Sequence, residues 1–384
     1  MTHKIIQDSQ SGPTVCGLFS GIGGLELGFH LNGFHSQLLC EIDPVASHVL
    51  KVRFPGIELV SDVRDVSSLR NADVLCAGFP CQNLSSSGNK IGISGTQSSL
   101  VDEIFRLLES NHPKWVVIEN VRFMLHLNQG EAMRRIVDNF EQLGYNWAYR
   151  VIDSQSFGVP QRRHRVYFIA SRTEDPRNVI LSDDSIRPEA LKDLTIEEPI
   201  GFYWTEGAYA AGLNRNAIPP LKAGSTIGIP SPPAICFPDG LVGTPDIRDA
   251  ERVQGFHENW TKPAEEVAKP SIRWRLLGNS VTVNVSEWIA QKILRPIPYD
   301  ASKDRPLDKK WPMAAWSIDK QRHESFSSDW PFNSRMAQIS DFLRHPIKPL
   351  SVRATNGFLS RAYKGNLKYP KGFLEILSNH SGSK

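Results

Sequence analysis

The chain has 384 residues, 40% of them hydrophobic, which is enough to bury one large core or two modest ones. No stretch approaches eighteen uninterrupted apolar residues and the N-terminal segment is polar, so we expect a soluble, cytoplasmic protein that makes no membrane contact. The net charge is only +3, but residues 291–384 carry 17 Lys and Arg against 8 Asp and Glu. Such an excess would attract phosphate groups, and a solvated tail would have the same composition.

The first third alternates short apolar runs with helical patterns, which predicts a doubly wound α/β fold with a largely parallel sheet. A last pair of strands, separated by a turn with Gly158 and Pro160, predicts an antiparallel hairpin at the end of the sheet. The predicted strands are Thr14–Phe19, Gln37–Glu41, Ile57–Val60, Asp73–Ala77, Trp115–Glu119, Asn146–Asp153 and Val166–Ala170.

Periodicity fades after residue 170, where prolines and glycines become frequent. This predicts a smaller, loop-rich second domain over residues 171–270. A short helix is expected at Arg248–Phe256 and a longer one at Ser286–Leu294. From Pro296 the sequence is irregular, so residues 296–384 form a basic C-terminal extension without an assigned role.

A glycine-rich run, Phe19–Phe29, follows the first predicted strand and opens a helix. Glycines let backbone amides approach a ligand closely, although a tight turn without a ligand would also use them. Glu26 stands where a dinucleotide-binding motif needs its third glycine, which disfavours a nicotinamide cofactor. Glu41 and Asp62 end the next two strands, where carboxylates could accept hydrogen bonds from a ribose and an adenine, or could be surface groups or helix caps.

Cys81 follows the fourth strand in the segment Gly78-Phe-Pro-Cys-Gln82. The carboxyl edge of a parallel sheet is where open α/β folds bind ligands, and the polar, flexible sequence after Cys81 argues against burial. The stretch Ser85–Ser98 suits a lid over a substrate, or equally a plain solvent loop. The sequence has no Cys-x-x-Cys pair and no Cys/His cluster at zinc spacing, so no metal site is predicted. Buried structural roles are expected for the other cysteines, Cys16, Cys40, Cys76 and Cys236.

Two further groups are expected at the same sheet edge. Glu119 ends the fifth strand, and Arg163 and Arg165 enter the seventh, where alternation would put both arginines on one face. Taken singly, these are ordinary surface charges. Together with a thiol they suit one reaction: a thiolate adds to carbon 6 of cytosine, which makes carbon 5 nucleophilic, while a carboxyl relieves the charge at ring nitrogen 3. Nearby arginines would favour the thiolate, and the base would have to leave the duplex.

These residues lie in motifs that resemble those of the bacterial DNA cytosine-5 methyltransferases over residues 13–295. Any one motif could arise by chance, whereas eight in the family's order are a strong signal. The motifs are Phe19-Ser-Gly-Ile-Gly-Gly24, Glu41-Ile-Asp-Pro44, Asp62-Val63, Gly78-Phe-Pro-Cys-Gln82, Glu119-Asn-Val121, Gln161-Arg-Arg-His-Arg165, Arg248-Asp-Ala-Glu-Arg-Val-Gln-Gly-Phe256 and Leu277-Gly-Asn-Ser-Val281.

The resemblance implies a Rossmann-like fold that binds S-adenosyl-L-methionine, with a catalytic and cofactor-binding domain of residues 13–170 plus 271–295 and a target recognition domain of residues 171–270. It implies Cys81 as nucleophile, Glu119 at ring nitrogen 3, and Arg163 and Arg165 beside the pocket. The last motif would fold back as a helix against the first strand. The implied cofactor contacts are Phe19, Gly21, Gly23, Glu41, Ile42, Asp62, Val63, Pro80, Asn279 and Ser280.

The partners implied are double-stranded DNA and a cognate restriction endonuclease. No second copy of the chain is implied, so we expect a monomer. One departure is His164, which stands where the family often has Glu and should point away from the two arginines. The second is the extension 296–384, for which extra DNA contact is a hypothesis.

Three other functions remain open at this stage: an RNA cytosine methyltransferase, a non-catalytic DNA-binding module that kept the fold, and a dinucleotide-dependent oxidoreductase. Methyl transfer to duplex DNA or to tRNA would separate the first, and covalent trapping on DNA would separate the second. The bases read around the target depend on a few side chains in the least regular region, so the sequence does not predict the recognition site.

Overall fold

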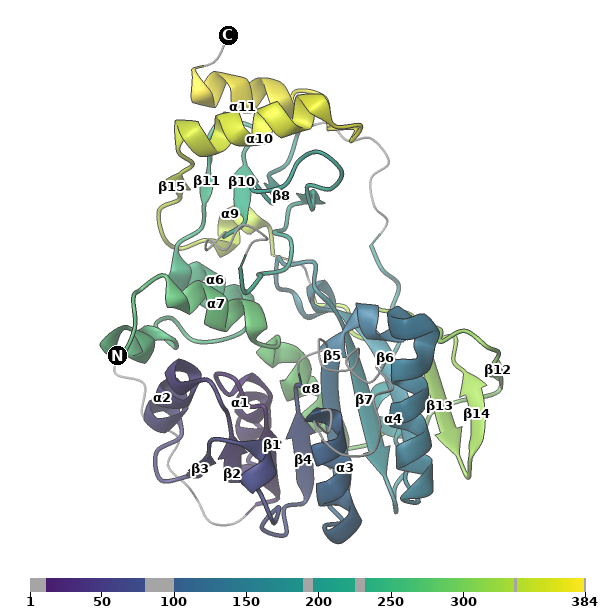
Figure 1. Cartoon of the computed structure of the whole chain (residues 1–384). Helices are drawn as coiled ribbons and strands as arrows, with labels where there is room; N and C mark the ends of the chain where they lie inside the picture. The colour runs from purple at the N-terminus through teal and green to yellow at the C-terminus, as the bar shows by residue number, and fades with distance from the viewer. Residues whose placement is uncertain (1–11, 80–99, 189–195, 225–231, 335–336, 383–384) are drawn as a thin grey trace, which may run out of the picture. The chain divides into compact units, whose positions relative to one another are not determined.

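The structure is a computed structural model that describes residues 12–79, 100–188, 196–224, 232–334 and 337–382 (Figure 1). The chain divides into two compact units, each assembled from separate segments. The first unit comprises Met1–Asp153, His164–Ile186 and Val281–Phe332. The second comprises Ser154–Arg163, Arg187–Ser280 and Asn333–Lys384.

The described part of the first unit is built on a ten-stranded sheet in the order β12-β14-β13-β6-β7-β5-β4-β1-β2-β3. Strands β3, β2, β1, β4 and β5 run parallel, and β7 lies antiparallel between β5 and β6, as the predicted hairpin requires. The strands are β1 (Thr14–Leu18), β2 (His35–Cys40), β3 (Glu58–Val60), β4 (Val74–Ala77), β5 (Trp115–Val121), β6 (Asn146–Asp153), β7 (His164–Ser171), β12 (Arg305–Pro306), β13 (Ala314–Ile318) and β14 (Gln321–Glu324).

Helices cover both faces of this sheet, so the doubly wound α/β prediction is confirmed. Strand alternation separates the faces: Cys16 and Leu18 of β1 pack into the core under α3 and α4, whereas Gly17 faces Glu26 of α1. On that second face α8 packs against α1 and α5. The elements are α1 (Gly24–His30), α2 (Pro44–Arg53), η1 (Val63–Asp65), α3 (Leu100–Ser110), η4 (Arg122–Gly130), α4 (Glu131–Gln142), α5 (Arg177–Ile180) and α8 (Val283–Leu294).

The helix after the last sequence motif, α8, returns to the start of the chain and packs on α1, the helix that follows the first strand. A Cβ at Gly28 would lie 2.5 Å from the backbone nitrogen of Glu287, so the two helices approach closely only because residue 28 is glycine. Ser286 Oγ donates to the carbonyl of Leu25 at 2.6 Å. These contacts attach residues 283–294 to α1 of the first unit.

The C-terminal extension is not an irregular tail, which corrects the predicted organisation. β13 pairs antiparallel with β6, from Ala314↔Arg150 to Ser317↔Trp147, and β14 and β12 continue the sheet (Figure 1). Trp311 packs edge-on against Trp147 and donates to the carbonyl of Gly130 at 2.9 Å. The observed units therefore do not have the predicted boundaries 171–270 and 296–384. Strands β12, β13 and β14 extend one edge of the large sheet, and sequence periodicity does not show which edge a short strand joins.

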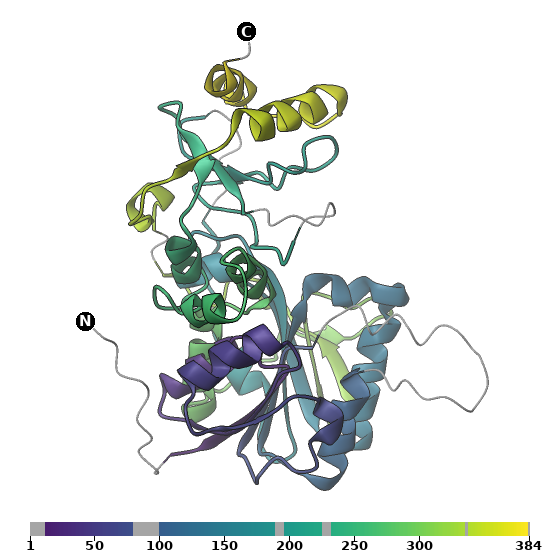
Figure 2. The same ribbon diagram turned by 60° about the vertical axis from the view of Figure 1, so that its left-hand side comes forward.

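The second unit holds a smaller sheet in the order β15-β11-β10-β8-β9, with α10 and α11 packed on it (Figure 2). Its core joins Phe202 of β8 to Phe358 and Phe373 of the two helices. The elements are η5 (Ser154–Phe157), β8 (Ile200–Phe202), β9 (Asn214–Arg215), β10 (Ala234–Cys236), β11 (Val242–Thr244), α6 (Ile247–Val253), η6 (Lys262–Glu266), α7 (Ile272–Asn279), α9 (Ile339–Phe342), β15 (Lys348–Pro349), α10 (Val352–Lys364) and α11 (Phe373–Ser381).

Within the described ranges, none of the helices has the length and apolar character needed to cross a bilayer.

Candidate active site

The loop between β1 and α1 bends through left-handed backbone at Phe19 (φ 56°), Gly21 (φ 58°) and Gly23 (φ 81°). A bulky residue in this region is strained by about 1–3 kcal/mol, so the fold must hold Phe19 in place. Ser20 N–H donates to the carbonyl of Cys40 at 3.0 Å, which ties the loop to β2. A Cβ at Gly21 would meet no atom within 4 Å, so the backbone faces open space there.

Glu41 links this loop to the next helix. Its carboxylate accepts hydrogen bonds from the N–H groups of Gly21 and Asp43, each at 2.7 Å. Burial raises its pKa above the ordinary value despite these two bonds. A carboxylate has about four acceptor positions, so the bonds from Gly21, Asp43 and the backbone of Ile42 leave room for a further donor. Ile42 beside it is 69% exposed, which presents an apolar side chain at the end of the sheet.

Asp62 and Val63 follow β3 at the same edge. The Asp62 carboxylate caps η1 and binds Arg64 through Nε at 2.9 Å and Nη2 at 2.5 Å. These hydrogen bonds with Arg64 lower the pKa of Asp62 to about 2. Val63 is buried in the core. The ion pair is exposed, where such contacts contribute about 0–1 kcal/mol, so a ligand could displace Arg64 at little cost.

Glu119 and Arg165 form an ion pair, with Arg165 Nε 3.0 Å from Glu119 Oε1. The register explains the contact: Val121 lies opposite Arg165 and Glu119 opposite Tyr167, so the two charged residues are diagonal neighbours on one face of the sheet. Glu119 is 8% exposed, which strengthens the interaction relative to one in water. Arg165 Nη1 also donates to the carbonyl of His164 at 2.9 Å.

Pro80 and Cys81 lie outside the described residues, which end before them at Phe79. Phe79 is itself held in place, because the buried amide of Asn120 donates to its carbonyl at 3.0 Å. The four other cysteines are buried and free, as predicted. Burial raises the thiol pKa of each well above its ordinary value, to about 12 for Cys16, Cys40 and Cys236, with Cys76 shifted in the same direction.

Arg163 has hydrogen-bond partners of its own, apart from the Glu119–Arg165 pair. Strand β7 begins at His164. Just before it, the carbonyl of Arg163 accepts from Ser154 N–H at 3.0 Å, and Gln161 forms a bridge to Ile218. Arg163 is buried in the second unit and donates to the carbonyls of Leu221, Gly278 and Ser280. It therefore holds the turn that carries Asn279 and Ser280.

Three of the sequence motifs meet in a buried polar network in the second unit. Gln161 Nε2 donates to Gln254 Oε1 at 3.1 Å, and Gln254 Nε2 donates to the carbonyl of Leu277 at 3.0 Å. Gln161 Oε1 in turn accepts from Leu221 N–H at 2.9 Å. Both glutamines are fully buried. Such networks fix one arrangement of the backbone, because any buried amide left unpaired is costly.

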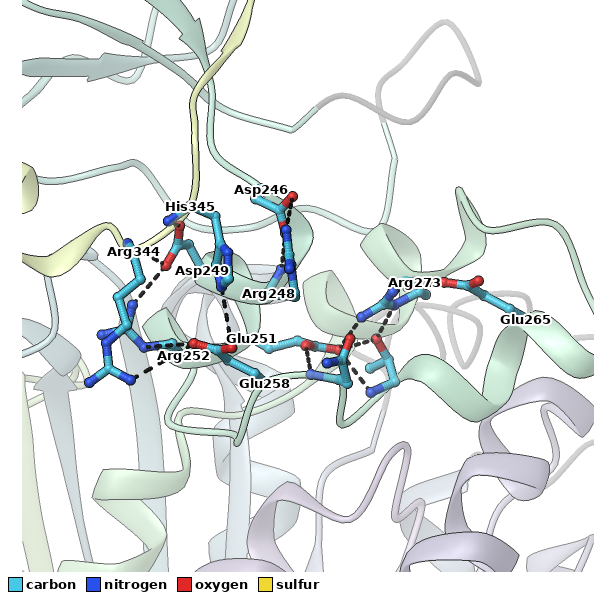
Figure 3. Close-up of polar contacts among 12 residues, drawn as sticks. Asp246, Arg248, Asp249, Glu251, Arg252, Glu258, Glu265, Arg273, Arg344 and His345 are labelled. Carbon is cyan, nitrogen blue, oxygen red and sulfur yellow. Dashed lines mark hydrogen bonds and ion pairs between the residues drawn. The ribbon is translucent and has the colours of Figure 1, made fainter. Parts of the chain in front are cut away.

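Around α6 a set of charges joins this region to the C-terminal extension (Figure 3). Buried Asp249 accepts from the N–H groups of Arg344 and His345 at 3.0 and 2.9 Å, and pairs with Arg252 at 2.7 Å. On the other side, Glu251 and Arg273 form a buried pair at 2.8 Å. The motif Arg248–Phe256 thus also connects α6 to the C-terminal extension and to α7.

Comparisons with known proteins give the family and agree with the fold. The C-5 cytosine-specific DNA methylase family matches residues 14–207. The Bacillus subtilis protein Type II methyltransferase M2.BsuMI is 45% identical over 94% of this chain and 97% of its own length. Type II methyltransferase M.HaeII of Haemophilus aegyptius is 28% identical over 73% of this chain and 92% of its own.

Among solved structures, the S. pombe Dnmt2 methyltransferase matches with a TM-score of 0.55 at 18% identity, covering 74% of this chain and all of that one. The Entamoeba histolytica methyltransferase EhMeth also gives 0.55, at 16% identity. At this identity the likeness concerns the fold alone. The large, mostly parallel sheet thus gives the chain a mixed α/β fold like that of these methyltransferase structures. The chain belongs to the C-5 cytosine-specific DNA methylase family, as a DNA cytosine-5 methyltransferase.

Sequence reasoning gave no separate role to several residues that shape the site. Asn120, Gln161 and Gln254 lie inside quoted motifs, so the signal was present, but their partners are 41 to 93 positions away. Asp153 and Asp329, which contact His164, lie outside every motif. No local pattern marks them.

Proposed function

We propose that this enzyme transfers a methyl group from S-adenosyl-L-methionine to carbon 5 of a cytosine that has left the DNA duplex, through a covalent bond between Cys81 and carbon 6. The observation that carries the proposal is the Glu119–Arg165 pair at the carboxyl end of the sheet, beside the Asn120 contact that holds Phe79 two residues before Cys81.

The residues divide the chemistry among them. The Cys81 thiolate adds to carbon 6 and a carbon–sulfur bond forms while ring electrons move toward nitrogen 3. Glu119 shares a proton with that nitrogen, so no isolated anion develops on the ring. Loss of the carbon 5 proton after methyl transfer, followed by departure of the thiolate, restores the ring. Because the four described cysteines are buried with raised pKa values, Cys81 is the thiol suited to this role.

The arginines have different tasks in this proposal. Arg165 binds Glu119 directly and fixes its orientation toward the base. Arg163 acts through the backbone, because its guanidinium binds the carbonyls of Gly278 and Ser280. Its role is then to shape the turn at Asn279 and Ser280, both proposed cofactor contacts.

The residues at the end of β1, β2 and β3 fit S-adenosylmethionine, which supplies an electrophilic methyl group on a sulfonium sulfur when bound. Phe19, Gly21 and Gly23 line a backbone loop that has room for a ligand at Gly21. Glu41 keeps acceptor positions for ribose hydroxyls, and exposed Ile42 suits the face of an adenine ring. Asp62, with Val63 next to it, would exchange Arg64 for the adenine amino group. Pro80 completes the proposed set.

The second unit is proposed to read the DNA bases as a target recognition domain. Loops around its small sheet are attached to motif residues, because Gln161 accepts from Leu221 N–H and Asp249 accepts from Arg344 N–H. The substrate is double-stranded DNA. We further propose that the enzyme acts as a monomer in the cytoplasm, alongside a restriction endonuclease of the same specificity. The name of one relative, a Type II methyltransferase, supports this proposal.

The test is covalent trapping on a duplex that contains 5-fluorocytosine, where fluorine cannot leave as a proton does. With S-adenosylmethionine present, the wild type should give a complex that survives denaturing electrophoresis. Cys81→Ser should give none, whereas Cys236→Ala, which changes a buried thiol in the second unit, should trap normally. Normal turnover by Cys81→Ser would refute the mechanism, and faster methylation of tRNA than of DNA would refute the substrate.

A further inference from the structure

We propose that Asp329, in the C-terminal extension, is a positioning residue for the catalytic pair, acting through His164. This inference rests on the proposed function, because it assumes that Glu119 and Arg165 work on the cytosine. It assigns a task to a segment for which the sequence predicted none.

The side chain of His164 lies between two carboxylates. Its Nε2 is 3.0 Å from Asp329 Oδ2 and 3.4 Å from Asp153 Oδ2. Ionised carboxylates only accept hydrogen bonds, so Nε2 must carry the proton and donate. Asp153 is fully buried, and the side chains of His164 and Asp329 are only 16% and 17% exposed. A charge-assisted contact in this setting is stronger and better oriented than one in water.

The Asp329 segment is itself held rigidly against β6. Asp153 N–H donates to the carbonyl of Asp329 at 3.0 Å. One residue earlier, the carbonyl of Ser328 accepts from Nε of Arg150 at 2.6 Å, and Arg150 is completely buried. Asp184 joins them, since its carboxylate accepts from Arg150 at 2.5 Å and from Ser328 N–H at 3.0 Å. The carboxylate of Asp329 is therefore presented from a fixed backbone.

The path from His164 to the catalytic pair is short. His164 is the first residue of β7 and lies opposite Asp153, so its side chain and that of Arg165 project from opposite faces of the sheet. The carbonyl of His164 accepts from Arg165 Nη1 at 2.9 Å, and Arg165 Nε binds Glu119 at 3.0 Å. Anchoring the imidazole fixes that carbonyl, and the carbonyl helps to aim the guanidinium. Without the anchor, only the pairing with β6 would hold the first residue of the strand.

The arrangement also explains why residue 164 is histidine in this chain. A glutamate there would place a third carboxylate against Asp153 and Asp329, and like charges so close together repel. His164→Glu, which restores the residue that related enzymes often have, should therefore be more harmful than His164→Gln, whose amide can still donate.

The experiment compares steady-state methyl transfer and DNA binding across matched variants. Asp329→Ala should lower kcat about tenfold to a hundredfold, the scale of a misplaced catalytic group, with the DNA KM unchanged within about twofold. Asp329→Asn keeps an oxygen acceptor of the same shape and should retain most of kcat, which also guards against a variant that merely unfolds. Asp308→Ala removes an exposed carboxylate from the same extension and should behave as wild type.

A double-mutant cycle completes the test. His164→Ala with Asp329→Ala should lose no more activity than either single change, because both break the same link. Wild-type kcat in Asp329→Ala, or losses that multiply in the double variant, would overturn the proposal. Since the three side chains offer ligand atoms within 4.8 Å of one another, activity lost to a chelator and restored by Zn²⁺ would also overturn it. Normal turnover of Glu119→Gln would instead refute the proposed function, whereas an inactive Glu119→Gln beside a fully active Asp329→Ala would refute only this inference.

Discussion

Replacing Glu26 with Gln should stabilise the first unit at alkaline pH. Glu26 lies in the first turn of α1 with 1% of its surface exposed. Its carboxyl occupies the space beside Gly17, where a Cβ would come within 2.0 Å of Oε1. Burial, assisted by the negative charge of Glu41, raises the pKa of Glu26 from 4.5 to about 7. A folded-state pKa above the unfolded one means that stability is greatest below pH 4.5 and falls as pH rises to about 7.

The pKa difference lowers the free energy of unfolding by about 3 kcal/mol in total, at 1.36 kcal/mol per pH unit. Most of this loss, about 2.5 kcal/mol, develops between pH 5 and pH 8. Glu26→Gln has no such proton to lose, so its advantage over the wild type should grow by that amount across this range. Urea unfolding at several pH values, followed by tryptophan fluorescence, measures it. Glu58→Gln is the control: Arg70 lowers the pKa of Glu58, so its contribution changes only at acid pH. Parallel curves for Glu26→Gln and the wild type between pH 5 and pH 8 would refute the reasoning.

Two further predictions concern the thiols and the extension. Under native conditions iodoacetamide should alkylate Cys81 and spare the buried thiols of Cys16, Cys40, Cys76 and Cys236, as peptide mass spectrometry would show. Labelling of a buried thiol under these conditions would contradict its burial. Deleting residues 296–384 removes β13 and exposes the edge of β6, so we expect aggregated protein rather than a folded enzyme with weaker DNA binding. A soluble truncated chain that unfolds cooperatively would show that these strands are dispensable.

Local patterns were sufficient for the parallel half of the first unit. Strands β1, β4 and β5 are short, mostly apolar runs, and burial on both faces leaves that signature in the sequence. The same holds for the Glu119 and Arg165 pair. Once β5 and β7 are neighbours, their register alone makes these two residues meet.

Contacts between distant segments could not be obtained in this way. Strands β13 and β14 are short, and their place depends on which sheet edge remains open after β6 and β7 have paired. Arg163 binds the backbone carbonyls of Leu221, Gly278 and Ser280, and the backbone just before it bridges from Gln161 to Ile218. In both cases the decisive partner is remote in sequence, and a period of two or 3.6 residues carries no information about it.

The amino-acid sequence by itself therefore determined the family, the order of the motifs and the chemical character of the site, because a thiol, a carboxyl and the guanidinium groups are written into short segments. Only the tertiary structure decided that Asp329 reaches His164, that Asp249 holds the backbone of Arg344 and His345, and that the extension completes both sheets. These contacts form because the folded core leaves particular edges and buried polar groups that must find partners, wherever along the chain those partners lie.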